Sequence, residues 1–515
     1  MKRNLKIKGV ILPILLLLMV TGVAGAVLDD IFLRDSGDGG GIPMNGNNRH
    51  NVPFWRKVAY SSPAYALAII GIPVYVYIPK FYTDVVGINV VLLGYILFSV
   101  RLFDAVSDPV IGYLSDRTKT RFGRRRPYIA VGAVFTAAMM IFLFNPPMAS
   151  PTVETIWFGV FIYALFLFWT IVTVPYESLG PEITFDYNER IALFGMRDGF
   201  LIAGTMAAAG APALMQWVFA LPGDAAGERI KFFWISVLYT PLLIGTAWWC
   251  VWAIKEEYPQ SEKDTGIVSG LRQVMRNRPF IILLAAYTIS AIGNNLPATL
   301  ILFYVQYVLQ SDLADFFLLL YFVSGIVFLP GWIYIARRTG KKRAWLASMA
   351  INSGAFVGVF FLGPGDVWTY GVLVFLSGIG FGATLAIPSA IQADVIDYDE
   401  LLTGERREGQ YIGLWSIAKK MAAAVGIGAG LTLLGMAGYQ PNVEQTETVR
   451  LVLRLLYALI PSFCNLLGLV VALAYPINDR IHAEIRQAIA KKRAGYKVEN
   501  PLSDRVWTLP DDRVR

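Results

Sequence analysis

The chain has 515 residues, of which 56% are hydrophobic and only 16% are charged. This balance excludes most soluble enzymes and predicts a polytopic membrane protein. Lys and Arg exceed Asp and Glu by 45 to 37, and the 2 cysteines and 2 histidines form no disulfide framework or metal motif.

The N-terminal segment 1–54 contains the first apolar run, from Val10 to Leu28, after the basic start MKRNLKIKG. The sequence Ala24-Gly25-Ala26 within it resembles a signal-peptidase site. Cleavage or anchoring there would place the following residues outside and invert every loop assigned below. The segment is therefore predicted to be either a thirteenth helix that starts outside or a stretch upstream of the true start, for which Met44 is a candidate.

Twelve further apolar runs follow, and each is long enough to cross a bilayer as an α-helix. They predict spans at 57–80, 88–114, 127–146, 154–177, 192–220, 232–254, 279–309, 314–337, 344–362, 367–391, 410–437 and 450–476. The polar segment 255–278 is predicted to be a cytoplasmic linker between an N-terminal bundle, 55–254, and a C-terminal bundle, 279–476. Residues 477–515 are expected to form a cytoplasmic tail.

Basic loops give the expected orientation, because short cytoplasmic loops hold an excess of Lys and Arg. The loop after the second span, DRTKTRFGRRR, and the loop after the eighth, ARRTGKKR, are strongly basic, whereas NPPMASP and GPGD contain no Lys or Arg. Both ends of the 12-helix body are therefore expected on the inner side of the cytoplasmic membrane, and the positive charge does not indicate nucleic-acid binding. The two basic loops occupy the same place in each half, which favours a parallel internal repeat.

Two carboxylates, Asp104 and Asp108, lie inside the second span, and their spacing of four places them on one face of a helix. Like charges so close are unfavourable unless a cation or proton lies between them, and the cost grows inside a membrane. One interpretation is a structural ion pair with Arg101 and another buried base. The other is a cation-coupling site completed by Ser107 or backbone carbonyls, since a hard ion prefers several oxygen ligands.

Several sequence blocks together carry a family resemblance. YTDVVG precedes the second span, RLFDAVSDPVIG lies within it and DRTKTRFGRRRP follows it, while PYESLGPEITFDYNERIALFGMRDG and ADVIDYDELLTGERREGQYIG occur later. From about residue 55 to 475 the chain resembles the melibiose permease-like glycoside-pentoside-hexuronide:cation symporters of the major facilitator superfamily. The resemblance implies an all-α major facilitator fold, with 12 transmembrane helices in two six-helix bundles, and cation-coupled symport by alternating access.

The resemblance also implies roles for the intramembrane charges. Asp104 and Asp108 match the family's cation-binding aspartates, with Na⁺ or H⁺, and possible use of Li⁺, as the coupling ion and with no other cofactor. The bases that match their charge partners are Arg101, Arg197, and Lys420 or its neighbour Lys419. A basic partner for each acid is also expected on physical grounds, because an uncompensated charge inside the membrane is costly.

Substrate recognition departs from the family pattern. Tyr75 matches a cavity tyrosine of the first span, and it is a candidate substrate contact together with Thr173. The sugar-binding aspartates that the resemblance to melibiose permease implies fall at Ala68 and Thr173, and neither is an acid here. Glu177 replaces an aromatic residue that would stack on the sugar ring. It is predicted either to accept hydrogen bonds from sugar hydroxyls or to pair with an arginine near the cytoplasmic exit, and a galactoside substrate is not assumed.

Amides in the seventh span are further candidates for substrate binding. Asn294 and Asn295 interrupt an otherwise apolar helix, where they either recognise sugar hydroxyls or form hydrogen bonds between helices. Trp415 offers a flat face on which a pyranose ring can stack.

Charged residues near the cytoplasmic ends suggest a gate. Asp116, Arg117 and Arg124 of one half, with Asp394 and Asp397 of the other, are predicted to form ion pairs between the bundles when the inner side is closed. The alternative is that these groups are simply solvated, because exposed ion pairs contribute little to stability.

The predicted function is cation-coupled symport of a sugar or glycoside by a chain that is embedded in the lipid bilayer, expected to be a monomer and not an enzyme. Within the same fold, the alternative is a symporter of a lysolipid or another amphiphile. A membrane-embedded transferase for lipid-linked sugars should have acidic motifs in a large extramembrane loop, which this sequence lacks. A non-transporting sensor would not need the paired acids.

Overall fold

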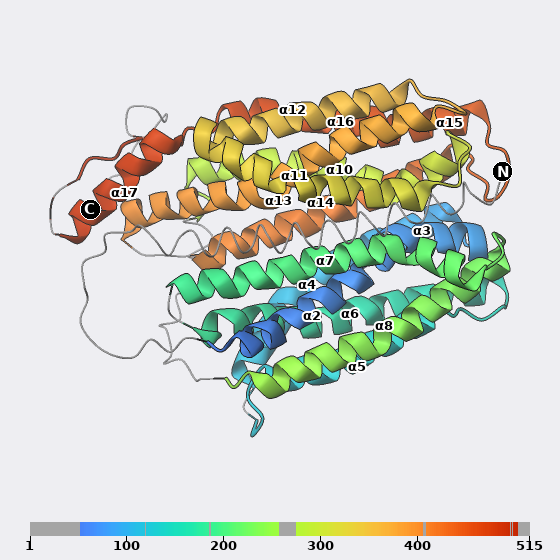
Figure 1. Cartoon of the computed structure of the whole chain (residues 1–515), viewed down its shortest axis with the longest axis horizontal. Coiled ribbons are helices and arrows are strands. Elements are labelled where there is room, and N and C mark those ends of the chain that lie inside the picture. The colour runs from blue at the N-terminus through green and yellow to red at the C-terminus, as the bar shows by residue number, and fades with distance from the viewer. Residues whose placement is uncertain are drawn as a thin grey trace. The chain divides into compact units, whose positions relative to one another are not determined.

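The computed structural model describes residues 52–118, 120–184, 187–256, 274–404, 408–494, 496 and 498–502. Within these residues every regular element is a helix, as Figure 1 shows, and the predicted all-α class is confirmed. Most of the segment 1–54 and of the linker 255–278 lies outside the described residues, so the predictions made for them stay predictions.

The helices follow the predicted spans closely. Those of the first half are α2 (Phe54–Ile72), η2 (Pro73–Tyr77), α3 (Ile78–Lys80), η3 (Phe81–Val86), α4 (Val90–Arg117), α5 (Arg126–Leu143), α6 (Pro151–Ile183), α7 (Tyr187–Phe219) and α8 (Ala225–Ala253). Those of the second half are α10 (Arg278–Tyr307), α11 (Ala314–Thr339), α12 (Lys341–Phe360), α13 (Val367–Thr403), α14 (Glu408–Met436), α15 (Glu447–Arg454), η4 (Leu455–Leu459), α16 (Ile460–Leu473) and α17 (Asp479–Arg493).

Eleven helical stretches among the described residues are long and apolar enough to cross a membrane. The ninth predicted span, 344–362, is present as the 20-residue helix α12, which is not among those eleven. It is less apolar because it carries polar residues such as Ser348 and Asn352, and both of these are buried against other parts of the protein. Its polar face therefore belongs to helix packing.

The described residues fold into two compact units. The first comprises the described residues of Met1–Gln260, Ala298–Val323 and Gly428–Val452, and the second those of Ser261–Pro297, Ser324–Ile427 and Leu453–Arg515. In the first unit α2 packs against α7 and α8, α5 packs against α6 and α8, and α4 packs against α6. In the second unit α12 packs against α13 and α16. The predicted bundle boundaries stay a prediction.

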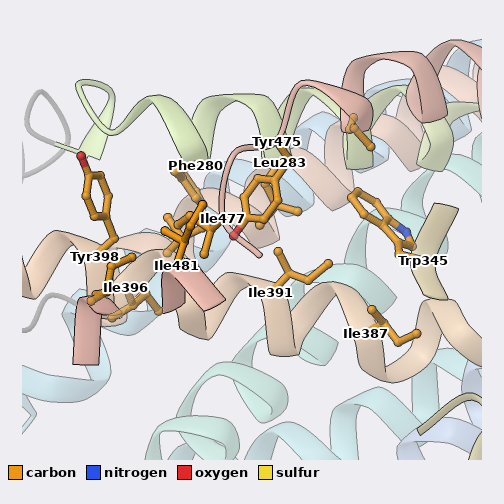
Figure 2. Close-up of a cluster of buried hydrophobic side chains, with 14 of the residues drawn as sticks. Phe280, Leu283, Trp345, Ile387, Ile391, Ile396, Tyr398, Tyr475, Ile477 and Ile481 are labelled. Atoms are coloured by element: carbon orange, nitrogen blue, oxygen red, sulfur yellow. The ribbon is translucent and has the colours of Figure 1, made fainter. Parts of the chain in front are cut away.

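A buried apolar cluster holds the C-terminal helix α17 in the second unit. Ile481 and Ile485 of α17 are buried among side chains of α10, α12 and α13, and Figure 2 shows Ile477 and Ile481 near Phe280 in this cluster. Burial of apolar side chains is the main favourable term for such docking. The first part of the predicted tail, 477–515, therefore contains a packed helix.

The helix that begins with α2 contains two π-helical turns, η2 and η3, with only the short α3 between them. Such turns interrupt regular α-helix geometry and occur frequently at functional sites. Gly87, with a φ of 96°, ends the helix in the left-handed region. The next helix, α4, starts at a capped end, because the Asn89 side chain accepts hydrogen bonds from the amides of Val91 (2.9 Å) and Leu92 (3.2 Å).

Small residues let α2 and α7 approach closely. A Cβ atom added at Gly204 of α7 would lie 2.3 Å from the carbonyl oxygen of Tyr65 and 3.0 Å from Cβ of Ala68. Ala68, one of the two positions where the resemblance implies a sugar-binding aspartate, thus faces the α2–α7 interface. Membrane helices use small residues at such crossings because van der Waals packing holds them together.

Replacing Gly204 with alanine should destabilise the protein, because the new methyl group meets a backbone atom that cannot move alone. We expect a loss of about 1–3 kcal/mol, the usual range for overpacking, seen as a lower thermal-unfolding midpoint in detergent. Gly210→Ala is the matched control on α7, since nothing lies within 4 Å of a Cβ there and alanine favours the helix. Equal midpoints for the two variants would contradict this packing.

Candidate functional site

The two aspartates of the second span converge with a threonine from α6. The Thr170 hydroxyl lies 3.0 Å from Oδ1 of Asp104 and 3.2 Å from Oδ1 of Asp108. Asp104 is 4% exposed and Thr170 is fully buried, whereas Asp108 is half-buried. A hydroxyl carries one hydrogen, so Thr170 can donate fully to only one carboxylate at a time. The structure thus brings both predicted acids to one shared donor.

Ser107 adds another oxygen to this group. Its hydroxyl donates to the backbone carbonyl of Asp104 at 3.1 Å and lies 3.5 Å from the Thr170 hydroxyl. The resulting cluster contains two carboxylates and two hydroxyls, all of them oxygen ligands of the kind that hard cations prefer. No group of three or more His, Cys, Asp or Glu suited to a metal ion occurs in the described parts of the chain.

Arg101 lies beside the pair and is held by aromatic rings. Its guanidinium carbon sits 4.1 Å from the ring centroid of Tyr75 and 4.5 Å from that of Phe166, and Nη1 is 3.9 Å from Oδ2 of Asp104. Cation–π contacts with two rings stabilise a buried guanidinium, and Arg101 is only 6% exposed. Arg101 and Tyr75, predicted as a charge partner and a cavity residue, therefore join the Asp104 end of the cluster.

The other predicted residues of α6 and α7 lie around a second group of aromatic rings. Arg197 pairs with its neighbour Asp198 at 2.7 Å, lies over the Phe194 ring at 4.9 Å, and interacts electrostatically with Tyr60. Glu177 is exposed and also interacts electrostatically with Tyr60. Glu177 and Arg197 therefore both interact electrostatically with the phenol of Tyr60.

Thr173, the other position where the family has a sugar-binding aspartate, directs its hydroxyl back along its own helix. The hydroxyl donates to the backbone carbonyl of Trp169 at 3.0 Å, a common use of threonine inside a helix. Its lone pairs stay available to a ligand, but its hydrogen is engaged. A role for Thr173 in substrate binding stays a prediction.

Asn294 takes part in a hydrogen-bonded network that joins four helices of the second unit. Its side-chain oxygen accepts from Asn352 of α12 at 3.3 Å and from Asn465 of α16 at 2.9 Å. Ser377 of α13 donates to Asn352 at 2.6 Å. Of the two interpretations of Asn294, this geometry favours hydrogen bonding between helices.

The remaining candidates of the second unit lie on α10 and α14. Asn295 donates to the Ala291 carbonyl of its own helix at 2.7 Å, and the Trp415 ring lies against Tyr287, with ring centroids 4.1 Å apart and the planes tilted by 31°. Lys420 is half-buried and Lys419 is exposed. Their predicted roles, in substrate binding for the first two and as charge partners for the lysines, stay predictions.

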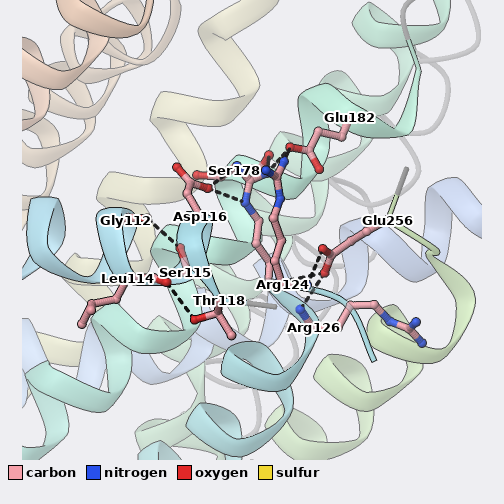
Figure 3. A network of polar contacts seen from close by, with 11 residues as sticks. Gly112, Leu114, Ser115, Asp116, Thr118, Arg124, Arg126, Ser178, Glu182 and Glu256 are labelled. Atoms are coloured by element: carbon pink, nitrogen blue, oxygen red, sulfur yellow. Dashed lines mark hydrogen bonds and ion pairs between the residues drawn. The ribbon is translucent and has the colours of Figure 1, made fainter. Parts of the chain in front are cut away.

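The gating candidates of the first unit form an ion-pair network at the basic loop. Arg125 pairs with Asp116 at 2.7 Å and with Glu182 at 2.6 Å, and Arg124 also pairs with Glu182. Figure 3 shows Asp116 and Glu182 facing the arginine side chains of this loop. Arg117 instead lies over the Tyr113 ring, 4.0 Å from its centroid.

Glu256, which begins the linker region, completes this network through the backbone. Its carboxylate accepts from the amides of Arg124 (2.7 Å), Arg125 (2.9 Å) and Arg126 (2.8 Å), and Figure 3 shows these contacts. A carboxylate at the N-terminus of α5 compensates unsatisfied amides and the helix dipole. Gly123 permits the contact, because a Cβ there would lie 2.7 Å from the Glu256 carboxylate.

The gating candidates of the second unit also have partners within their own unit. Asp394 pairs with Lys341 at 2.6 Å, and Asp397 lies 2.9 Å from the imidazole of His482 on α17. These contacts tie α13 to α12 and to the C-terminal helix. Pairing between the two bundles stays a prediction.

Sequence reasoning missed Thr170, Glu182 and Glu256. Thr170 lies one turn before the predicted Thr173, and only the packing of α6 on α4 distinguishes the two. Glu182 falls in the block PYESLGPEI that carries the family resemblance, and Glu256 lies two residues after the predicted sixth span. For Glu182 and Glu256, an acidic side chain near a basic loop was the available signal for an ion pair.

Comparison with known proteins gives consistent results. Residues 59–479 match the family model described as MFS/sugar transport protein. The glucuronide carrier protein homolog of Escherichia coli K12 is 28% identical over 82% of the chain and 92% of that protein. The sodium-dependent lysophosphatidylcholine symporter 1-A of Danio rerio is 26% identical over 85% of the chain and 88% of that protein.

Among solved structures, the chain resembles a bacterial homolog of the human lysosomal transporter Spinster in an inward-facing, unoccupied conformation. The TM-score is 0.60 at 14% identity, over 87% of this chain and 99% of that one. At this identity the likeness concerns the fold.

Removal of the shared hydroxyl should weaken the aspartate cluster. Thr170→Val keeps the side-chain shape but leaves the two carboxylates without this donor, so we expect a loss of about 1–3 kcal/mol, seen as a lower thermal-unfolding midpoint. Thr173→Val is the matched control on the same helix, because its hydroxyl donates to the backbone. A larger loss at Thr173 than at Thr170 would count against the cluster.

Proposed function

The chain belongs to the MFS/sugar transport protein family, whose model matches residues 59–479, and from this we propose that it couples sugar transport to a cation gradient. It is a multi-pass membrane transporter and not an enzyme. The resemblance of its motifs to the family is thereby confirmed. The proposal adds that Na⁺ or H⁺ is co-transported with a sugar or glycoside across the cytoplasmic membrane, with both ends of the helical body inside.

One observation carries the proposal: two carboxylates of α4 share the hydroxyl of Thr170. Two ionised carboxylates one turn apart repel each other, and low dielectric increases that repulsion. A bound cation or a proton lowers this cost, and the adjacent hydroxyls of Ser107 and Thr170 supply further oxygen ligands. The pair is thus suited to bind an ion reversibly within the membrane.

Arg101 has a supporting role in this proposal. At 3.9 Å from Asp104 it lowers the cost of an ionised carboxylate, while the rings of Tyr75 and Phe166 hold the guanidinium in place. An arginine cannot lose its proton in a protein. The charge that changes during the cycle is therefore carried by the ion and the aspartates.

Ion binding drives transport only if it alters which conformations are allowed. We propose that the ion-loaded site permits substrate binding and that the protein changes orientation when both ligands are bound or both are absent. A ligand shifts a conformational equilibrium only by its difference in affinity for the two states. Because the protein does not change orientation with the ion alone, the ion and the substrate cross the membrane together.

Tyr75 and Glu177 are the proposed sugar contacts in the first unit. Tyr75 lies against Arg101 and near Trp169, with ring centroids 6.2 Å apart, so aromatic surface adjoins the ion site. Asn295 and Trp415 are the proposed contacts in the second unit. A substrate touching Tyr75 would act directly on the side chain that stacks on Arg101.

A lysolipid is the second candidate substrate, because one relative is named a lysophosphatidylcholine symporter. Ala68 and Thr173 stand where the resemblance to melibiose permease-like carriers implies sugar-binding aspartates, which makes this chain less suited to a galactoside. Competition between sugars and lysolipids for ion-dependent uptake distinguishes the two candidates.

Thermal unfolding of the purified protein tests the ion site without a known substrate. A ligand that binds only the folded state raises its stability, by about 2.7 kcal/mol at 100 times its dissociation constant. We expect Na⁺ or Li⁺ chloride to raise the unfolding midpoint relative to choline and K⁺ chloride at equal ionic strength. Asp104→Asn and Asp108→Asn should each abolish the shift.

Asp116→Asn is the control, because it removes a carboxylate of the basic-loop network and leaves the pair intact. If no salt raises the midpoint, the same scan against pH decides between proton binding and a structural ion pair. A midpoint whose pH dependence is unchanged in both aspartate variants would refute the proposed ion site.

A further inference from the structure

The motif YTDVVG contains an acid, Asp84, that has no part in the ion site. Asp84 lies in the π-helical turn η3 of the first unit and is 9% exposed. It lies at the end of the first span, before α4, whereas the basic loop follows α4. A buried carboxylate requires charged or hydrogen-bonding partners, and these come from distant parts of the chain.

Three hydroxyl groups donate to the Asp84 carboxylate. Tyr307, at the end of α10, donates to Oδ2 at 2.8 Å, and Thr83 donates to Oδ1 at 2.8 Å. Tyr439, in the segment between α14 and α15, also donates to Oδ1. Residues separated by 223 and 355 positions from Asp84 are thus joined to one carboxylate.

Asn442 adds two more hydrogen bonds to the same cluster. Its side-chain amide donates to the backbone carbonyl of Asp84 at 2.6 Å, and its backbone amide donates to the Tyr307 hydroxyl at 3.0 Å. Asn442 has a φ of 59°, in the left-handed region that asparagine tolerates better than most residues. The conformation of this segment is therefore adapted to the contact.

The two donors that come from distant parts of the chain, Tyr307 and Tyr439, are phenols, which matters for how the cluster opens. Burial, followed by the negative charge of Asp84, raises the pKa of Tyr439, so this phenol stays protonated and donates. Hydrogen bonds to a charged group are strong when buried, but much of their contribution is replaced when water can hydrate both partners. Such bonds hold firmly while the cluster is dry and weaken once water enters.

Other contacts of the first unit tie the same helices together. The Tyr77 hydroxyl donates to Asp315, at the start of α11, at 2.6 Å. A Cβ at Gly94 of α4 would lie 2.8 Å from the Thr432 hydroxyl of α14. The segment from η2 to α4 is thus joined to later helices by hydrogen bonds and by close packing.

We propose that the cluster of Asp84, Tyr307, Tyr439 and Asn442 is a latch. It keeps the transporter closed at the end where η3, the end of α10 and the segment between α14 and α15 meet. It rests on the proposed function, in which the protein opens alternately to the two sides. Asp84 is accordingly a positioning residue that sets how often this end opens, and it contacts neither the ion nor the substrate. The latch differs from the basic loop because hydroxyl groups, and not arginines, donate to its carboxylate.

Cysteine labelling in detergent measures this opening without ion, substrate or membrane orientation. The reporter is Val308→Cys, next to Tyr307 and fully buried, in a Cys250→Ala and Cys464→Ala background. We expect Asp84→Asn to increase the rate of maleimide labelling about tenfold, which corresponds to a shift of about 1.4 kcal/mol in the opening equilibrium. Tyr439→Phe, which removes one hydrogen bond to the carboxylate, should give a smaller increase.

Tyr370→Phe is the matched control, because it removes a hydroxyl from the buried Tyr370–Tyr457 pair of the second unit, 2.6 Å apart. It should leave the labelling rate unchanged. Unchanged rates in both Asp84→Asn and Tyr439→Phe would overturn the latch, as would failure of both variants to fold. Thermal unfolding that shows neither a salt effect nor a pH effect dependent on Asp104 and Asp108 would refute the ion site and leave this labelling result intact.

Discussion

The cost of keeping carboxylates ionised inside a membrane protein is the constraint on which this structure depends. Asp104 and Asp108 lie one turn apart on α4, where repulsion between them is strongest if both are charged. The surrounding residues reduce that cost: Thr170 offers one hydroxyl to both acids, and Arg101 lies near one of them. An ion that binds reversibly can reduce it further, which gives the pair its proposed function.

The same constraint is met differently at other buried or partly buried acids. Glu256 accepts hydrogen bonds from three backbone amides at the start of α5, Glu182 pairs with two arginines, and Asp84 accepts from the hydroxyls of Thr83 and two tyrosines. The amides and arginines that bind Glu256 and Glu182 belong to the same local structure as these carboxylates. The phenols hold Asp84 only while distant segments stay together. This difference separates acids that stabilise one local structure from an acid suited to a conformational change.

Much of the fold could be predicted from sequence, because apolar runs and basic loops report directly on the membrane. The aspartate pair could also be predicted, since a spacing of four fixes a shared helix face whatever the tertiary structure. Thr170 could not be distinguished from Thr173 in the same way. The two hydroxyls differ only in how α6 is rotated against α4, and that rotation depends on packing that no local pattern encodes.

The polar residues of the second half illustrate the same limit. The sequence left Asn294 open between substrate binding and helix packing, and only its contacts with Asn352 and Asn465 favour the second. Likewise Ala68 could be identified as the loss of an acid, but its contact with Gly204 required the α2–α7 interface. The charged candidates for a gate were recognisable by composition, whereas their partners Arg125, Glu182 and His482 depended on tertiary structure.

Infrared difference spectroscopy tests the central claim most directly, because it observes the carboxylates themselves. Spectra of the purified protein are compared after exchange of choline for sodium and after a change of pH. The account predicts that one of the two exchanges alters carboxylate bands and that Asp104→Asn and Asp108→Asn both remove this change. If neither exchange produces a carboxylate signal that depends on these aspartates, the pair is a permanent structural ion pair and the account is wrong.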